Sequence, residues 1–154
     1  MTHGVTPTPC AGRSLTLLWI KPTQAFGFCQ ASDSDSERRL AIILEDDTTV
    51  IKWIKPATGK VRIDYASAEI YNPDFIVETH DHKYMCEPKR ANQVDDAVVR
   101  SKALAAATWC QHATAHAQTH GGKPWSYLLI PHDQITSEKT MQGLAAAFTI
   151  DAAA

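Results

Sequence analysis

Hydrophobic residues recur at helical spacing in the stretch that follows Ser34. Leu40, Ile43 and Leu44 fall on one side of a helix. Ser34 and Glu37 have the spacing of a capping box, in which each side chain bonds a backbone N–H at the start of the helix. Acidic residues at this position also suit the positive end of a helix. The sequence therefore predicts a helix that begins at about Ser34.

A second, longer helix is predicted over residues 94–117, which are rich in alanine. Its buried stripe consists of Val99, Ala103, Ala106, Cys110, Ala113 and Ala117. Gly121 and Gly122 follow this stretch and are typical of a helix C-terminus. A last helix is predicted over about residues 137–148.

Strands are predicted between these helices. Residues 50–55 form a short strand or a turn of helix that ends at Pro56, and residues 61–65 form a strand after a Thr58-Gly59-Lys60 turn. Residues 75–79 and 84–89 are predicted to form a hairpin around the polar link at 80–83. Residues 125–130 are almost continuously apolar, as in a strand that is buried on both faces.

The predicted order is helix, three strands, long helix, strand, helix (α-β-β-β-α-β-α). This order indicates an α/β fold with a mixed sheet flanked by helices, in which the last strand lies parallel to an earlier one through a helical crossover. Residues 31–150 are sufficient for one domain with a core. Residues 1–30 lack periodicity, are interrupted by Pro7, Pro9 and Pro22, and are interpreted as an N-terminal extension or a remnant of a longer protein.

Composition limits the possible partners. The formal net charge is -2, so no overall positive field attracts nucleic acid, and DNA binding has to be argued from a site. The four cysteines are far apart and form no CxxC pair, which favours free thiols in a reducing cytosol. The apolar residues 15–20 are too few to span a membrane and lack a signal-peptide pattern. We therefore expect a cytoplasmic protein with no membrane partner.

The predicted hairpin gathers three charged residues. Side chains alternate along a strand, so Glu87 and Lys89 point to the same face. If residues 80–83 are the turn, residue 74 lies opposite 89 and residue 76 opposite 87. Asp74, Glu87 and Lys89 then meet at one end of one sheet face. A shift of the register by one residue would turn Glu87 and Lys89 away from Asp74.

Two carboxylates and an ammonium group on one face have a clear chemical use. A hard divalent cation such as Mg²⁺, or Mn²⁺ in its place, binds carboxylate oxygens, backbone carbonyls and water. Asp74, Glu87 and the Pro88 carbonyl are the predicted ligands, and Glu37 at the start of the first helix adds an acidic ligand. Lys89 would hold the attacking water or offset the charge of a phosphorane. The alternative is a surface ion pair of Lys89, worth less than about 1 kcal/mol.

Other candidate residues have simpler interpretations. Asp81-His82-Lys83 is a second acid-x-Lys triplet, but it lies in the predicted turn. His112, His116 and His120 recur every four residues and are interpreted as a solvated stripe on the long helix. Trp53 and Trp125 have the rings to stack on bases, but burial is the favoured interpretation.

Several segments together resemble the C-terminal endonuclease domain of type III restriction enzyme Res subunits and related helicase-nucleases, which belong to the PD-(D/E)XK nuclease superfamily. The resemblance covers about residues 31–150. The segments are Asp33-Ser-Asp-Ser-Glu-Arg-Arg-Leu-Ala, Tyr71-Asn-Pro-Asp-Phe-Ile-Val, Cys86-Glu-Pro-Lys, Lys102 with Ala105-Ala-Ala-Thr-Trp-Cys, and Trp125-Ser-Tyr-Leu-Leu-Ile-Pro.

The resemblance implies a restriction-endonuclease-like fold and a Mg²⁺-dependent nuclease that cuts double-stranded DNA. Asp74 and Glu87 correspond to metal ligands, Lys89 to the catalytic lysine and Glu37 to a helix-borne acid. Lys102 is a candidate phosphate contact to DNA. A separate motor or methyltransferase subunit and a homodimer are the partners that the resemblance suggests.

Two features depart from that family. Pro88 occupies a position where many members have another residue, and it removes a ladder N–H, which fits an edge position or a local bulge. The chain also has no Gly-x-x-x-x-Gly-Lys-Ser/Thr loop, so it has no ATP site of that kind. Two alternatives remain open: a catalytically inactive DNA-binding or docking remnant of a truncated enzyme, and a small structural or interaction domain.

Overall fold

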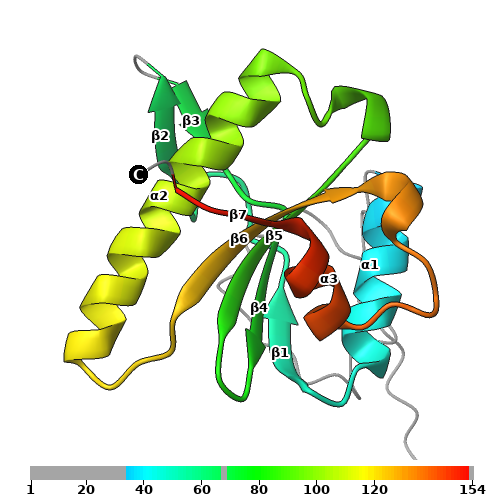
Figure 1. Ribbon diagram of the computed structural model, residues 1–154, viewed down its shortest axis with the longest axis horizontal. Coiled ribbons are helices and arrows are strands. Elements are labelled where there is room, and N and C mark those ends of the chain that lie inside the picture. Colours follow the sequence, from blue (N-terminus) through cyan, green and yellow to red (C-terminus); the bar gives the residue numbers. More distant parts are fainter. Residues whose placement is uncertain (1–33, 67–68, 153–154) are drawn as a thin grey trace, which may run out of the picture.

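A five-stranded sheet runs through the molecule and is covered by helices on both faces (Figure 1). The computed structural model describes residues 34–66 and 69–152, so the predicted extension at 1–30 lies outside the described residues. The sheet has the order β1-β4-β5-β6-β7, and all neighbours are antiparallel except β5 and β6. The predicted α/β class with a mixed sheet is confirmed. The strands are β1 (Val50–Ile54), β4 (Phe75–Thr79), β5 (Lys83–Lys89), β6 (Trp125–Pro131) and β7 (Thr149–Ile150).

The long helix α2 (Ala97–Thr119) connects the two parallel strands β5 and β6, as the predicted crossover requires. It begins three residues later than predicted, because the Asp96 side chain caps it by accepting the backbone N–H of Val98 at 2.9 Å and the short 3₁₀ turn η2 (Ala91–Gln93) precedes it. The helix ends before Gly121, whose φ of 68° only glycine adopts readily. Although α2 has 23 residues, neither it nor any other helix in the described ranges is long and apolar enough to cross a membrane.

Helices α1 (Asp35–Asp46) and α3 (Met141–Phe148) cover the other face of the sheet. The predicted cap of α1 is present, since the Ser34 hydroxyl accepts the backbone N–H of Glu37 at 3.4 Å. The return bond of a capping box is replaced, because the Glu37 carboxylate instead accepts from the Ser34 hydroxyl and from Lys55. Between β6 and α3 lies the 3₁₀ turn η3 (His132–Gln134), and α3 begins four residues later than predicted, capped by Thr140.

The sheet separates two hydrophobic clusters. Met85 of β5 is fully buried against α2, whereas its neighbour Cys86 is fully buried against α1 and α3. Because side chains alternate along a strand, Lys83, Glu87 and Lys89 share the α2 face with Met85. This face is where the site develops.

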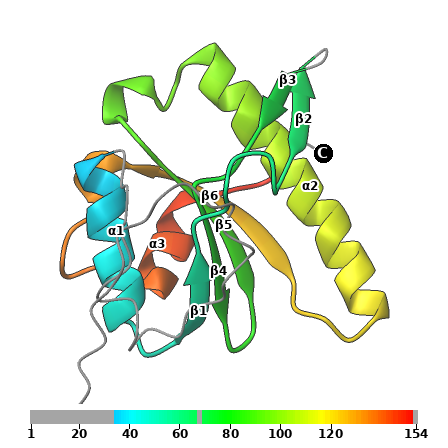
Figure 2. The ribbon, with the colours of Figure 1, turned by 180° about the vertical axis from the view of Figure 1, so that it is seen from behind.

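A separate hairpin of β2 (Ile63–Ala66) and β3 (Glu69–Tyr71) stands beside the N-terminal half of α2 (Figure 2). The predicted order placed the strand at 61–65 in the main sheet, which is wrong. The first strand of the main sheet is β1. The sequence had predicted either a short strand or a turn of helix for this segment. The short strands β3 and β7 were not predicted, because two or three residues give no periodic signal.

Candidate active site

Asp74 faces Glu87 across the antiparallel pair of β4 and β5. The pairing runs from Glu78 opposite Lys83 to Phe75 opposite Cys86, and its continuation brings Asp74 opposite Glu87. The predicted pairing of residue 74 with 89 and 76 with 87 is therefore wrong by two positions. Because the shift is even, the alternation of faces is preserved, and all three residues still share one face.

The hairpin turn explains the two-residue difference. The backbone N–H of Thr79 donates to the His82 carbonyl at 2.9 Å, and the Thr79 hydroxyl donates to the same carbonyl and to Asp81. Thr79 and His82 therefore close the turn, so β5 begins one residue earlier than predicted. In the acid-x-Lys triplet at residues 81–83, Asp81 and His82 belong to this turn and Lys83 is the first residue of β5.

The Asp74 and Glu87 carboxyl groups interact directly, and each affects the pKa of the other. Burial, followed by the charges of Glu87 and Glu37, raises the pKa of Asp74 to about 8. Burial also raises the pKa of Glu87, although the Tyr71 hydrogen bond and Lys89 oppose this effect. Glu87 is buried and Asp74 is half-buried, and two such carboxyl groups this close do not both ionise readily, so the pair holds one proton at neutral pH.

Glu87 is held in place from two sides. The residue is buried, with a relative exposure of 9%. The Tyr71 hydroxyl donates to Glu87 Oε2 at 2.8 Å, and Lys89 Nζ lies 3.6 Å from Glu87 Oε1. Tyr71 also packs edge-on against Tyr127, with 6.2 Å between ring centroids. Burial and the nearby Glu87 charge raise the pKa of both tyrosines, so Tyr71 remains a donor.

Pro88 lies where β5 pairs with a strand on one side only. The pairing with β4 reaches only to Cys86, whereas the parallel pairing with β6 continues without a shift to Lys89 opposite Pro131. Strand β5 is central in the sheet, but Pro88 is at a local edge, so a missing N–H is tolerated there. The sequence predicted an edge position or a local bulge at Pro88. The edge position agrees with this arrangement, and the unshifted register with β6 excludes the bulge.

Glu37 approaches the carboxyl pair from the start of α1. It is buried, with a relative exposure of 8%, and forms an ion pair with Lys55. The negative charge of Glu37 raises the pKa of Asp74, and the positive charge of Lys55 lowers it, so both groups lie close enough to act on Asp74. Lys55 was not predicted as a site residue. The sequence signal for Lys55 was its position directly after β1. Because β1 is antiparallel to β4, the last residue of β1 lies at the end of the sheet where β4 begins.

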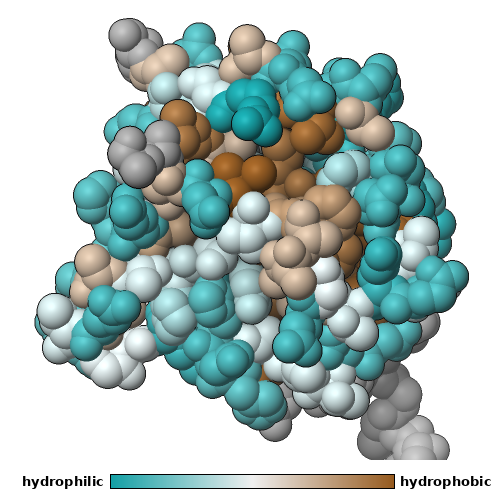
Figure 3. Space-filling model, viewed as in Figure 1, coloured by the Kyte–Doolittle hydropathy of each residue, from teal (hydrophilic) through white to brown (hydrophobic). Residues whose placement is uncertain are grey.

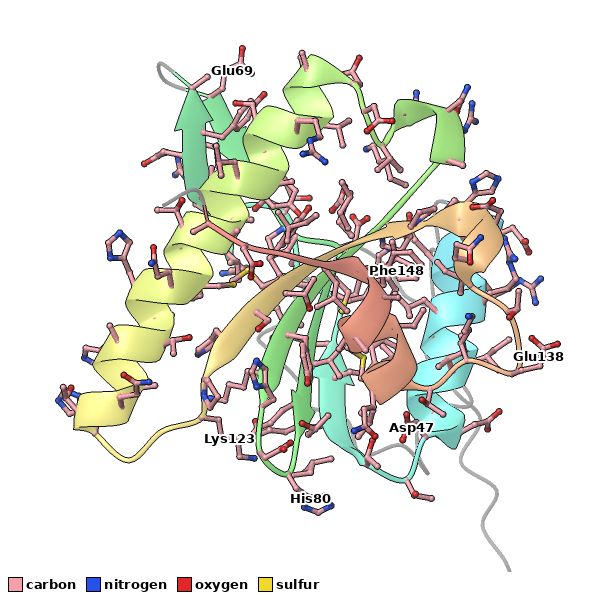
Figure 4. All side chains as sticks on the ribbon, viewed as in Figure 1. Asp47, Glu69, His80, Lys123, Glu138 and Phe148 are labelled. Carbon is pink, nitrogen blue, oxygen red and sulfur yellow. The ribbon has the colours of Figure 1, made fainter. Side chains whose placement is uncertain are left out.

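Lys102 lies on α2 and contacts the β2–β3 hairpin. Its Nζ is 5.1 Å from the centroid of the Tyr65 ring, a cation–π contact. The Tyr65 hydroxyl is in turn bonded to Glu69, which Figure 4 marks at the tip of the hairpin. The structure therefore brings Asp74, Glu87, Lys89 and Glu37 together and gives Lys102 a contact of its own beside the hairpin.

The donor set suits a hard cation. Within residues 34–66 and 69–152, no three His, Cys, Asp or Glu side chains are gathered into a ready metal-binding group. Asp74 and Glu87 nevertheless place two carboxyl groups side by side, next to the backbone of Pro88. Mg²⁺ is commonly bound by one or two carboxylates and keeps several waters. The residues present therefore fit such a cation, which would take the place of the shared proton.

Trp53, Cys86 and Cys110 are structural. Trp53 is buried against α1, with its indole N–H donating to Glu45 at 3.0 Å, as the burial interpretation predicts. Cys86 and Cys110 are buried free thiols, and burial raises the pKa of both, to about 12 for Cys110. Cys10 and Cys29 lie outside the described residues.

Comparison of the chain with protein-family models, with curated proteins and with solved structures gives no match. The resemblance to type III restriction endonuclease domains therefore depends on the sequence motifs alone. Function has to be inferred from the geometry and chemistry of the site.

Proposed function

We propose that this protein is a metal-dependent nuclease that hydrolyses phosphodiester bonds of double-stranded DNA. The observation that carries the proposal is the convergence of Asp74, Glu87 and Lys89 on one face, at the end of the β4–β5 pair. In the main sheet a helix, the strands β1, β4 and β5, a crossover helix and a parallel strand occur in this order, with the β2–β3 hairpin inserted between β1 and β4. This order supports a restriction-endonuclease-like fold.

Asp74, Glu87 and the Pro88 carbonyl would hold Mg²⁺, with Mn²⁺ as a substitute. When bound, the cation supplies polarisation of the phosphodiester and a lower pKa for a bound water. Glu37 would add a further carboxylate by exchanging its bond to Lys55. The raised pKa of Asp74 reflects the closeness of Glu87 and Glu37, and a bound cation would displace the proton that keeps this cluster from repelling itself.

The remaining residues of the site would orient Glu87 and the attacking water and stabilise negative charge on the phosphate. Tyr71 donates to one oxygen of Glu87 and leaves the other oxygen free to face Asp74 or Lys89. The Lys89 ammonium group can orient the attacking water or offset the negative charge that develops on the phosphate. Lys102, placed beside Tyr65, would contact a phosphate of the DNA. A cytoplasmic location, a motor or methyltransferase partner and a homodimer belong to the same proposal.

Nicking of supercoiled plasmid in Mg²⁺ or Mn²⁺ tests the function. Wild type should nick, and Lys89→Met should nick about a hundredfold more slowly, since removal of one group that stabilises developing charge costs about 10²–10³ in rate. Lys139→Met is the matched control, because Lys139 is exposed on the loop before α3. Equal rates for Lys89→Met and wild type would refute the site. A wild-type chain that binds DNA but never nicks it would favour the alternative of an inactive DNA-binding remnant.

A further inference from the structure

A cleft of about 550 Å³ lies at the opposite end of the sheet from the carboxyl pair. The buried stripe of α2 ends at Cys110, and Ala113 and Ala117, which the sequence predicted as buried, are half-buried and line the cleft. The full lining consists of Lys83, Trp109, His112, Ala113, His116, Ala117, His120, Gly122, Lys123 and Trp125. Its volume is in the range of small-molecule sites.

The charge of the lining is one-sided. The described residues that line it include two lysines and three histidines and no acidic residue, in a protein of net charge -2. Lys123, which Figure 4 marks to the right of the C-terminal end of α2, is held by Glu78 at 2.7 Å and by the Thr79 carbonyl. In the part of the chain that the structure describes, no carboxylate lies within ion-pair distance of Lys83. An anion would therefore meet the charge of Lys83 without a competing carboxylate, whereas the charge of Lys123 is shared with Glu78.

Aromatic rings form the inner wall of the cleft. Trp109 and Trp125 pack edge-on, with 5.3 Å between centroids, and Lys83 Nζ lies 5.3 Å from the Trp125 ring. Trp125 is fixed to α2, because its backbone N–H donates to the Thr114 hydroxyl at 2.8 Å and its carbonyl accepts from the same hydroxyl. Around the C-terminal end of α2 the surface is hydrophilic to neutral (Figure 3), so the indoles lie in a polar surrounding. Half-buried indoles beside lysines are the combination that binds bases and phosphates of single strands.

The histidines line the wall and do not converge on a point. The rings of His116 and His120 stack with 4.3 Å between centroids and an angle of 18° between planes. His120 Nδ1 is already within 2.9 Å of the His116 carbonyl and 2.8 Å of the Thr119 hydroxyl. This geometry arranges the rings one after another along the cleft, which suits an extended ligand better than a metal ion.

We propose that this cleft binds a nucleotide of a single-stranded DNA segment, with its phosphate at Lys83 and His116 and its base against the tryptophans. The inference rests on the proposed nuclease function for its choice of DNA. Lys83 and Lys89 share one face of β5 and are six residues apart. At about 3.3 Å per residue, the cleft lies about 20 Å from the catalytic lysine. A strand end produced or displaced at the carboxyl pair is therefore within reach of the cleft.

The test is fluorescence anisotropy with a labelled twelve-nucleotide thymidine oligomer, in EDTA so that binding is measured without cleavage. Lys83→Gln/His116→Gln should weaken binding about fivefold or more. The slope of log affinity against log salt should become shallower by about 0.7 for each phosphate that the variant no longer neutralises. The control is Lys139→Gln/His80→Gln, which removes the same residue types at exposed positions outside the cleft. Equal affinity and slope in the two double variants would overturn the proposal.

Two competitors identify the ligand. The oligomer should resist displacement by thymidine monophosphate at equal nucleotide concentration and by polyglutamate of equal charge. Equal displacement by the monophosphate would assign the cleft to a free nucleotide. Equal displacement by polyglutamate would assign it to polyanions in general. Either result contradicts the proposal. The cleft and the nuclease can fail separately. If the cleft variant loses oligomer binding but still nicks plasmid, the cleft proposal stands apart from catalysis. If wild type binds the oligomer but never nicks plasmid, the nuclease proposal fails and the cleft proposal stands.

Discussion

The carboxyl group of Asp74 faces that of Glu87 across the end of the β4–β5 pair, and the charge of Glu87 raises the pKa of Asp74. The two groups come from different strands and are brought together by backbone register. Their closeness costs free energy whenever both are ionised, and this cost makes the stability of the protein depend on pH.

Stability without metal should fall in alkali. The pKa of Asp74 is raised from 3.8 to about 8, so its contribution to folding is fully present below about pH 4 and is lost as pH rises through 8. We expect the free energy of unfolding in EDTA to fall by about 2 kcal/mol between pH 6 and pH 9, which lowers Tm by about 5 °C.

Thermal unfolding of Asp74→Asn checks this prediction. The amide cannot ionise but can still donate to Glu87, so the variant should lose most of the decline between pH 6 and pH 9. Asp133→Asn, at an exposed position, should decline as wild type does. A wild-type Tm that is flat or rising over this range would show that the pair does not share a proton.

Tyr71→Phe should destabilise the protein, because the variant removes the 2.8 Å hydrogen bond to buried Glu87. A hydrogen bond to a charged group contributes about 1.5–3 kcal/mol, and urea unfolding measures the loss. Tyr65→Phe is a matched control, since it removes a tyrosine–glutamate bond that is exposed, and it should cost only a few tenths of a kcal/mol. If the two variants lose equal stability, Tyr71 does not support Glu87 as described.

Lys55→Met should destabilise the protein by leaving Glu37 buried without its ion-pair partner. Removing one partner of a buried pair costs about 3–5 kcal/mol, and the partial exposure of Lys55 reduces the expected loss to about 1–2 kcal/mol. The double variant Lys55→Met/Glu37→Gln should recover most of that loss in urea unfolding. A double variant as unstable as the sum of the two single variants would mean that the pair is not an interacting unit.

The sequence was sufficient to predict the elements with strong local signals. The Ser34 cap, the alanine-rich α2 and the continuously apolar β6 each have a local cause, and together they imply the parallel crossover. The convergence of Asp74, Glu87 and Lys89 was predicted through a wrong register. It survived because an error of two positions leaves every side chain on its own face.

What the sequence could not predict depends on interactions between distant segments and on turn bonds. Thr79 belongs to the turn because of its bonds to Asp81 and His82, which no propensity anticipates. Tyr71 comes from a three-residue strand, and its importance follows from a bond to Glu87 on another sheet. The cleft lies along α2 beyond Cys110, where Ala113 and Ala117 continue the alanine stripe but are only half-buried.

The most direct test of the central claim is calorimetric titration of Mn²⁺ into wild type, Asp74→Asn and Asp133→Asn at neutral pH. We predict one Mn²⁺ per chain for wild type and Asp133→Asn, and binding at least about tenfold weaker for Asp74→Asn. Equal binding by Asp74→Asn, or no binding by wild type at millimolar Mn²⁺, would contradict the claim that Asp74 and Glu87 form the metal site of a nuclease.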